Sequence, residues 1–223
     1  MKTIKLCLLS IILIVACSPN ENRNTSDYNI NSNNVVNCIG ENPVYLDDNG
    51  ITIKACEWAL IGDSGVINGI SYTIVDIQTL EEMLETGDDV TRVCTTRILD
   101  MSGMFKNIEI FNQDISSWDV SNVTDMGGMF YDTDAFDQPI GDWDVSNVTR
   151  MDKMFAEAYA FNQPLDSWDV NNVTRMGHMF YIATSFNQDL SSWGVDGVIV
   201  CNGFSDDTPQ WTLPKPNFTN CNP

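Results

Sequence analysis

The second half of the chain repeats itself every 25 residues, and this period constrains the fold more than any other feature. Methionine, phenylalanine and tryptophan each return at fixed positions in four successive copies: Met101, Met126, Met151 and Met176; Phe111, Phe136, Phe161 and Phe186; Trp118, Trp143, Trp168 and Trp193. A fixed period of this length is typical of repeat proteins, in which each unit is too small to bury its own apolar face. The sequence therefore predicts coils that stack on their neighbours.

The pattern inside one repeat predicts a strand followed by a helix. The segment "ISSWDVSN" approximates the Leu-x-x-Leu-x-Leu of a leucine-rich repeat, which would point Trp118 and Val120 inward and Asp119 outward. The apolar residues of "NVTDMGGMF" then recur at steps of three and four, which predicts a short helix capped by Ser121 or Asn122. The predicted fold class is α/β: a leucine-rich-repeat-like solenoid of about four to five 25-residue coils with short parallel strands and short helices, preceded by an α+β N-terminal cap.

The segments on either side of the repeats have a different composition. Residues 38–90 contain "GITIKA" and "GISYTIV", which alternate as strands do, an Asn-Gly pair typical of a hairpin turn, and "DIQTLEEMLE" with helical spacing. These features predict an α+β cap. The repeats occupy 91–204, and residues 205–223, which carry three prolines, predict a C-terminal cap.

The first residues predict an exported lipoprotein. Two lysines, an apolar run and "IVAC" resemble the lipobox of bacterial lipoproteins, which implies that residues 1–16 are a signal peptide and that Cys17 carries the lipid. An ordinary secretory signal is the alternative. Ser18 stands where a retention signal would place Asp, which suggests the outer membrane. The asparagine-rich segment 17–37 is then a lipidated tether, and the predicted location is the bacterial cell surface.

Charge narrows the range of partners. The net charge is −20, a field that repels nucleic acid and anionic lipid surfaces, so no nucleic-acid partner is expected. The negative charge has two interpretations: it keeps the protein soluble at a crowded cell surface, or it attracts cations or basic partners. The predicted partners are the membrane, through the lipid on Cys17, and an unknown protein or glycan.

Five cysteines follow the predicted lipid attachment site. Cys201 stands 25 residues after a core methionine, near Cys221 in the predicted C-terminal cap, while Cys94 precedes the first full repeat, next to the cap that contains Cys56. We predict the disulfides Cys201–Cys221 and Cys56–Cys94, with Cys38 left over. No Cys-x-x-Cys or histidine-rich spacing indicates a metal site, and no cofactor is expected.

One stretch of the repeat carries a specific resemblance. The sequence "FNQDISSWDVSNVTDMGGMF" resembles the repeat of BspA-type leucine-rich-repeat surface proteins, bacterial surface lipoproteins whose repeat domain was long catalogued as of unknown function. The flanking "TIKACEW", "GVINGISYTIVD", "DDVTRVCTT" and "PNFTNC" are similar to the segments that border it. The resemblance covers nearly everything after the tether. It implies a cell-surface interaction module, with adhesion as the role most often proposed, and it implies no catalytic residues.

The aspartates of the repeated Trp-Asp-Val are the candidate binding face. On stacked strands, Asp119, Asp144 and Asp169 would form a column of like charges on one exposed side. They either accept hydrogen bonds from neighbouring Ser and Asn groups, which we favour because exposed charges repel weakly in salt, or bind Ca²⁺ or a cationic ligand. The repeated tryptophans are expected in the core rather than in a sugar-binding platform.

Three functions fit these residues. The first is a non-catalytic interaction or adhesion module for proteins or glycans, and we expect this one. The alternatives are a hydrolase that acts on surface polysaccharide through Asp residues, and a purely structural spacer. A hydrolase needs one carboxyl group with a raised pKa in an apolar pocket, whereas the repeated acids are predicted to be exposed.

Overall fold

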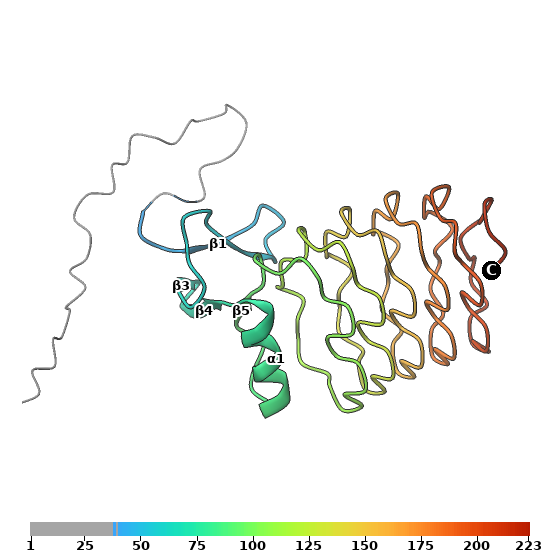
Figure 1. Cartoon of the computed structure of the whole chain (residues 1–223), viewed down its shortest axis with the longest axis horizontal. Helices are drawn as coiled ribbons and strands as arrows, with labels where there is room; N and C mark the ends of the chain where they lie inside the picture. The colour runs from blue at the N-terminus through green and yellow to red at the C-terminus, as the bar shows by residue number, and fades with distance from the viewer. Residues whose placement is uncertain (1–37, 39) are drawn as a thin grey trace, which may run out of the picture. The chain divides into compact units, whose positions relative to one another are not determined.

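The computed structural model describes residue 38 and residues 40–223 (Figure 1). In this part of the chain there are five strands and one helix, and all of them precede residue 95. The predicted signal peptide 1–16 and tether 17–37, including Cys17, lie outside the described residues. Within the described residues, no helix has the length and apolar character needed to span a membrane.

Two small sheets lie between residues 44 and 94. The first pairs β1 (Val44–Leu46) with β2 (Ile53–Ala55) in antiparallel register. The second has the order β3-β4-β5, in which β3 (Ser64–Ile67) and β4 (Ile70–Ile74) are antiparallel and β5 (Val93–Cys94) is parallel to β4. Residues from both sheets contribute to one apolar cluster.

Local signals set the hairpin and the helix of this region. Asn68 and Gly69 join β3 to β4 with φ angles of 51° and 82°, the two positive values that a type I′ turn requires. Helix α1 (Ile77–Thr86) begins after Asp76, whose carboxylate accepts the backbone N–H of Thr79 at 2.9 Å. The predicted turn and the predicted helix are both confirmed.

The repeats contain neither the predicted helices nor the predicted strands, so the predicted leucine-rich-repeat-like solenoid of strands and helices is wrong. Residues 95–223 run as successive turns, and their only strand-like pairing is a series of isolated parallel bridges: Asp100 to Asp125, Asp125 to Arg150, Arg150 to Arg175, and Arg175 to Val200. Figure 1 shows the resulting coils side by side, from green to red. The α+β elements occur only before residue 95.

Positive φ angles explain why the three- and four-residue spacing does not produce a helix. In "MSGMFKN", Gly103 and Asn107 have φ angles of 64° and 63°, which a right-handed helix cannot contain. The positive angles recur with the 25-residue period, and at two of the repeated positions the residue is Lys153 or His178 rather than glycine. The apolar periodicity therefore marks buried positions in a chain of turns.

The backbone hydrogen bonds of this segment hold neighbouring coils together. Alternate N–H groups donate across to the next coil at 2.9–3.0 Å, from Met101, Gly103, Phe105 and Asn107. Between them, the N–H groups of Met104 and Lys106 donate to carbonyls three residues earlier, and the N–H of Ser102 donates to the carboxylate of Asp100, so these bonds close the turns. Because half of the donors leave the local segment, the conformation depends on the adjacent coil.

Aromatic ladders fill the interior of the stack. Phe105, Phe130, Phe155 and Phe180 have ring centroids 5.1–5.5 Å apart, and a second phenylalanine ladder runs beside it. The repeated tryptophans are at most 5% exposed, and each indole N–H donates to a carbonyl 28 residues earlier at 2.9–3.2 Å. The prediction that the tryptophans form the core is confirmed.

The last coil is covered by the C-terminal segment. Trp211 is 6% exposed, and Phe218 packs against Phe204 with centroids 4.9 Å apart. The predicted disulfide between Cys201 and Cys221 is present. The apolar end of the stack is therefore shielded from water, as an open stack requires. The domain boundaries given above remain predictions.

The other predicted disulfide, Cys56–Cys94, is wrong. Cys56 pairs with Cys38, their Cα atoms 5.6 Å apart, and Cys94 is the unpaired cysteine of the described residues. Cys94 does follow the cap that contains Cys56, but its strand β5 pairs with β4 and buries the thiol against the carbonyl of Ile53. The pairing of strands, which sequence spacing does not encode, decided the choice.

Peptide mapping without reductant should find Cys38–Cys56 and Cys201–Cys221 peptides and an unmodified Cys94. Burial raises the pKa of the Cys94 thiol above its ordinary value, so the reactive thiolate is scarce in the native protein. We expect iodoacetamide to alkylate Cys94 only after denaturation. Rapid alkylation of the native protein at neutral pH would contradict this burial.

Candidate functional site

The predicted aspartate face is not uniformly exposed. Asp119 is only 1% exposed, which corrects the expectation that it points outward. Its carboxylate accepts the hydroxyls of Thr96 and Ser121, each at 2.6 Å, so the side chain is turned back toward the segment that precedes the first full coil. Asp119 therefore stabilises the junction and offers no free carboxylate to a ligand.

Asp144 and Asp169 are exposed and close local turns. Asp144 accepts the backbone N–H and the hydroxyl of Ser146, and Asp169 accepts the backbone N–H and the side-chain amide of Asn171. This is the hydrogen-bonded arrangement that the sequence analysis favoured. Within the described residues, no group of three or more His, Cys, Asp or Glu side chains could hold a metal ion. Binding at Asp144 and Asp169 remains a prediction.

The asparagine predicted to cap a helix instead links neighbouring coils. The Asn122 side chain donates to the Thr96 carbonyl at 3.1 Å, and the equivalent asparagines donate to the coil before them at 2.7–2.8 Å. In each repeated Asn-Val-Thr, the valine is therefore buried in the core and the asparagine side chain forms a hydrogen bond between coils. These two roles explain why the tripeptide recurs.

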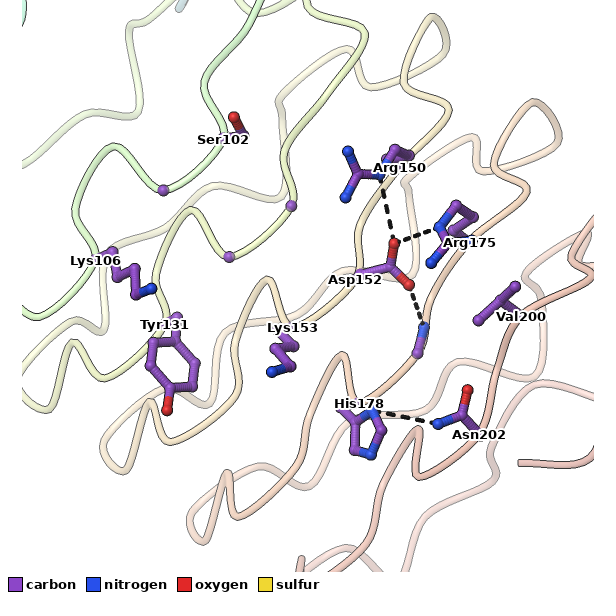
Figure 2. A pocket seen from close by; sticks show the side chains of 14 residues that line it. Ser102, Lys106, Tyr131, Arg150, Asp152, Lys153, Arg175, His178, Val200 and Asn202 are labelled. Atoms are coloured by element: carbon purple, nitrogen blue, oxygen red, sulfur yellow. Dashed lines mark hydrogen bonds and ion pairs between the residues drawn. The ribbon is translucent and has the colours of Figure 1, made fainter.

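A groove of about 620 Å³ lies on another face of the stack (Figure 2). It is lined by the turns that follow positions 101, 126, 151, 176 and 201, so every coil contributes a few residues. The floor is open partly because glycines occupy it. A Cβ atom at Gly127 or Gly177 would lie 3.1 Å from the carboxylate of Asp125 or Asp152. A side chain at either glycine would therefore press on these acids.

Two arginines share one carboxylate at this groove. Asp152 lies 2.7 Å from the Nε of Arg175 and 3.5 Å from the Nε of Arg150, and its other oxygen accepts the N–H of Gly177 at 3.0 Å. Arg150 also contacts Asp125 through Nη1 at 2.8 Å. Within the described residues, Nη2 of Arg150 and both terminal nitrogens of Arg175 have no protein acceptor. These donors can bind an external acceptor.

Two lysines flank one aromatic ring on the other side of the groove. The ammonium groups of Lys106 and Lys153 lie 5.3 Å and 5.8 Å from the centre of the Tyr131 ring, within the range of cation–π attraction (Figure 2). The Tyr131 hydroxyl donates to Glu157 at 3.1 Å, and this hydrogen bond is the main reason that the tyrosine pKa lies above its ordinary value. Tyr131 is therefore a neutral ring that holds two cations.

The groove collects positive charge on an acidic protein. It holds four of the eight lysines and arginines in the described part of the chain, and Asp152 is the acid in its lining. With His178 counted as neutral, the lining residues carry a net charge of +3, which falls to +1 when Asp125 and Glu157, the acids that contact Arg150 and Tyr131, are included. The chain as a whole carries −20. Such a local field attracts anions.

The sequence pattern did not predict this groove. Its basic residues are separated by up to 69 positions, from Lys106 to Arg175, and no short motif connects them. Aligning the repeats gives the missing signal, because Arg150 and Arg175 occupy one repeat position and Lys106 shares another with Tyr131. The sequence signal for the groove is weak, because its basic residues stand at positions where the residue type differs from one repeat to the next.

The groove lining offers donors that a ligand could accept from. The lining residues offer cationic donors, small polar groups and one histidine, whose Nδ1 lies 3.4 Å from the side-chain amide of Asn202. Asp152, the carboxylate in the lining, is engaged by two guanidinium groups and a backbone N–H. A carboxylate held in this way is poorly placed to act as a general acid.

Stacked 25-residue coils with an open groove that four cationic side chains line define a repeat protein with a basic surface groove. The chain belongs to the family described as "Mycoplasma protein of unknown function, DUF285", whose pattern matches residues 77–193. No curated protein and no solved structure matches the sequence.

Proposed function

We propose that this protein is a non-catalytic binding module of the bacterial cell surface, and that the basic groove receives its ligand. One observation carries the proposal: half of the described lysines and arginines gather at a single groove on a chain of net charge −20. Like charges repel each other, and the ion pairs of Arg150 and Arg175 with Asp125 and Asp152 offset only part of this cost, so a bound anion would offset more of it.

The resemblance to BspA-type leucine-rich-repeat surface proteins supports an interaction role, and adhesion is the form of it that we propose. The sequence motif at Cys17 supports attachment to the outer membrane by lipid, which would place the groove outside the cell. Mass spectrometry of the mature N-terminus should find an acylated Cys17. An unmodified N-terminus at another residue would contradict lipid anchoring but not ligand binding.

The alternatives receive less support. A hydrolase with paired aspartates would need carboxyl groups that can reach a substrate, but Asp119 is buried and hydrogen-bonded to Thr96 and Ser121, and Asp152 is held by two arginines. A purely structural spacer would account for the stacked coils, but it would not account for four cationic side chains at one groove.

The proposal is tested by screening the full chain against immobilised surface glycans and matrix proteins, with and without Ca²⁺. We expect at least one component to bind the wild-type chain and to lose most of this binding when Arg175 is replaced by alanine. The Arg92→Ala variant, which removes a cation outside the groove lining, is the matched control. Binding that survives the Arg175→Ala change unaltered would show that the groove is not the site.

A further inference from the structure

We infer that the ligand of the groove is an anionic glycan, a carbohydrate chain that bears carboxylate or sulfate groups. This inference rests on the proposed function, because it takes the groove as the binding site and specifies what the groove accepts. Three features of the groove lead to it: the kind of donors, their spacing along the coils, and the polarity of the surface between them.

The donors suit oxyanions. Asp152 contacts both arginines through their Nε atoms, and Asp125 contacts Nη1 of Arg150. Nη2 of Arg150 and both terminal nitrogens of Arg175 stay accessible on side chains that are 48% and 45% exposed. A fixed guanidinium presents a pair of N–H groups that matches the two oxygens of a carboxylate or sulfate. The Arg150–Arg175 pair therefore forms one anion-accepting centre, prepared before the ligand arrives.

The second centre differs in chemistry and lies along the same stack. Tyr131 holds the ammonium groups of Lys106 and Lys153, which act as point charges without a fixed donor geometry. Lys106 and Arg175 belong to coils three steps apart, and neighbouring coils hydrogen-bonded as parallel strands lie ~4.8 Å apart, which gives a span of about 14 Å along the stack. A ligand that reaches from Lys106 to Arg175 must be extended and carry several separated charges.

The surface between the centres favours a carbohydrate over an acidic peptide. Apart from Tyr131 and the charged residues, the side chains of the groove lining are mostly small or polar, as at Ser102 and Asn202 at its two ends, and Val200 is the one aliphatic side chain among the described lining residues. Peptide sites usually provide apolar pockets or a free strand edge, but the N–H groups of these turns already donate to adjacent coils. Hydroxyl groups of a sugar chain, in contrast, can pair with the polar side chains and fit over the glycine floor.

Calorimetric titration of the full chain tests the inference with four probes of similar length. They are a galacturonic acid hexamer, a heparin hexasaccharide, the neutral chitohexaose and a hexaglutamate peptide. We expect at least one acidic glycan to bind at least tenfold more tightly than both chitohexaose and the peptide. Its affinity should fall as salt is raised, because the contacts are ionic.

Variants connect the binding to the two centres. The Arg175→Ala and Lys153→Ala changes should each weaken binding of the acidic glycan about tenfold, while Arg92→Ala should leave it unchanged. The Arg175→Lys variant keeps the charge but loses the paired N–H geometry, and we expect it to recover only part of the affinity. Unchanged thermal unfolding of each variant establishes that a loss of binding does not come from misfolding.

The outcomes separate this inference from the proposed function. If hexaglutamate binds as tightly as the acidic glycans, or if no acidic glycan binds while a component of the surface screen still depends on Arg175, the glycan inference is overturned and the binding module stands. If acidic glycans bind but Arg175→Ala and Lys153→Ala have no effect, both the groove assignment and this inference fail.

Discussion

Replacing Trp143 with alanine should lower the free energy of unfolding by about 3–5 kcal/mol, the range for truncating a large aromatic side chain in a core. Trp143 is 3% exposed, its ring centroid lies 6.3 Å from that of Phe130, and its indole N–H donates to the carbonyl of Ile115 at 3.2 Å. The change would leave a cavity between coils and remove the donor to a buried carbonyl. Urea unfolding followed by circular dichroism measures the loss.

The Ile110→Ala variant is the control for this experiment. Ile110 is 87% exposed, so its truncation should change the free energy of unfolding by no more than about 0.5 kcal/mol, as for most surface substitutions. If Trp143→Ala were equally harmless, the indole would have to be exposed in solution, and the sugar-platform interpretation of the tryptophans would return.

Replacing Cys221 with serine should cost about 3 kcal/mol of stability, because the unfolded chain regains the entropy that the Cys201–Cys221 link removes from a segment of some 20 residues. Cys201 is buried, whereas Cys221 is partly exposed, so changing Cys221 breaks the link with the least disturbance of packing. The same loss would loosen the C-terminal segment that places Trp211 over the last coil. Thermal unfolding without reductant measures it.

A reducing agent provides the internal control. With reductant present, the wild-type chain and the Cys221→Ser variant should have nearly equal stability, since neither retains the Cys201–Cys221 link. A difference that persists under reduction would mean that the serine itself disturbs the packing. Equal stability without reductant would refute a stabilising role for the disulfide.

The sequence by itself determined the features that depend on short-range chemistry or on composition. The 25-residue period indicated which aromatic residues are buried, because a large apolar side chain repeated at one position must face the interior of any stack. The Asn68-Gly69 turn and helix α1 were predictable, because positive φ angles favour that dipeptide and Asp76 caps a local run of apolar spacing. The C-terminal disulfide followed from the repeat register.

Only the tertiary structure decided the features that depend on neighbouring coils. The predicted helices are absent because alternate N–H groups find better-placed acceptors in the next coil, while Gly103, Asn107 and their equivalents adopt positive φ angles. Strand pairing buried Cys94 and left Cys56 to Cys38. The groove is also a product of stacking. Its basic residues differ in type between repeats and are distant in the chain, and they become neighbours only because the coils lie a few ångströms apart. Electrostatic attraction to a ligand depends on this distance in space.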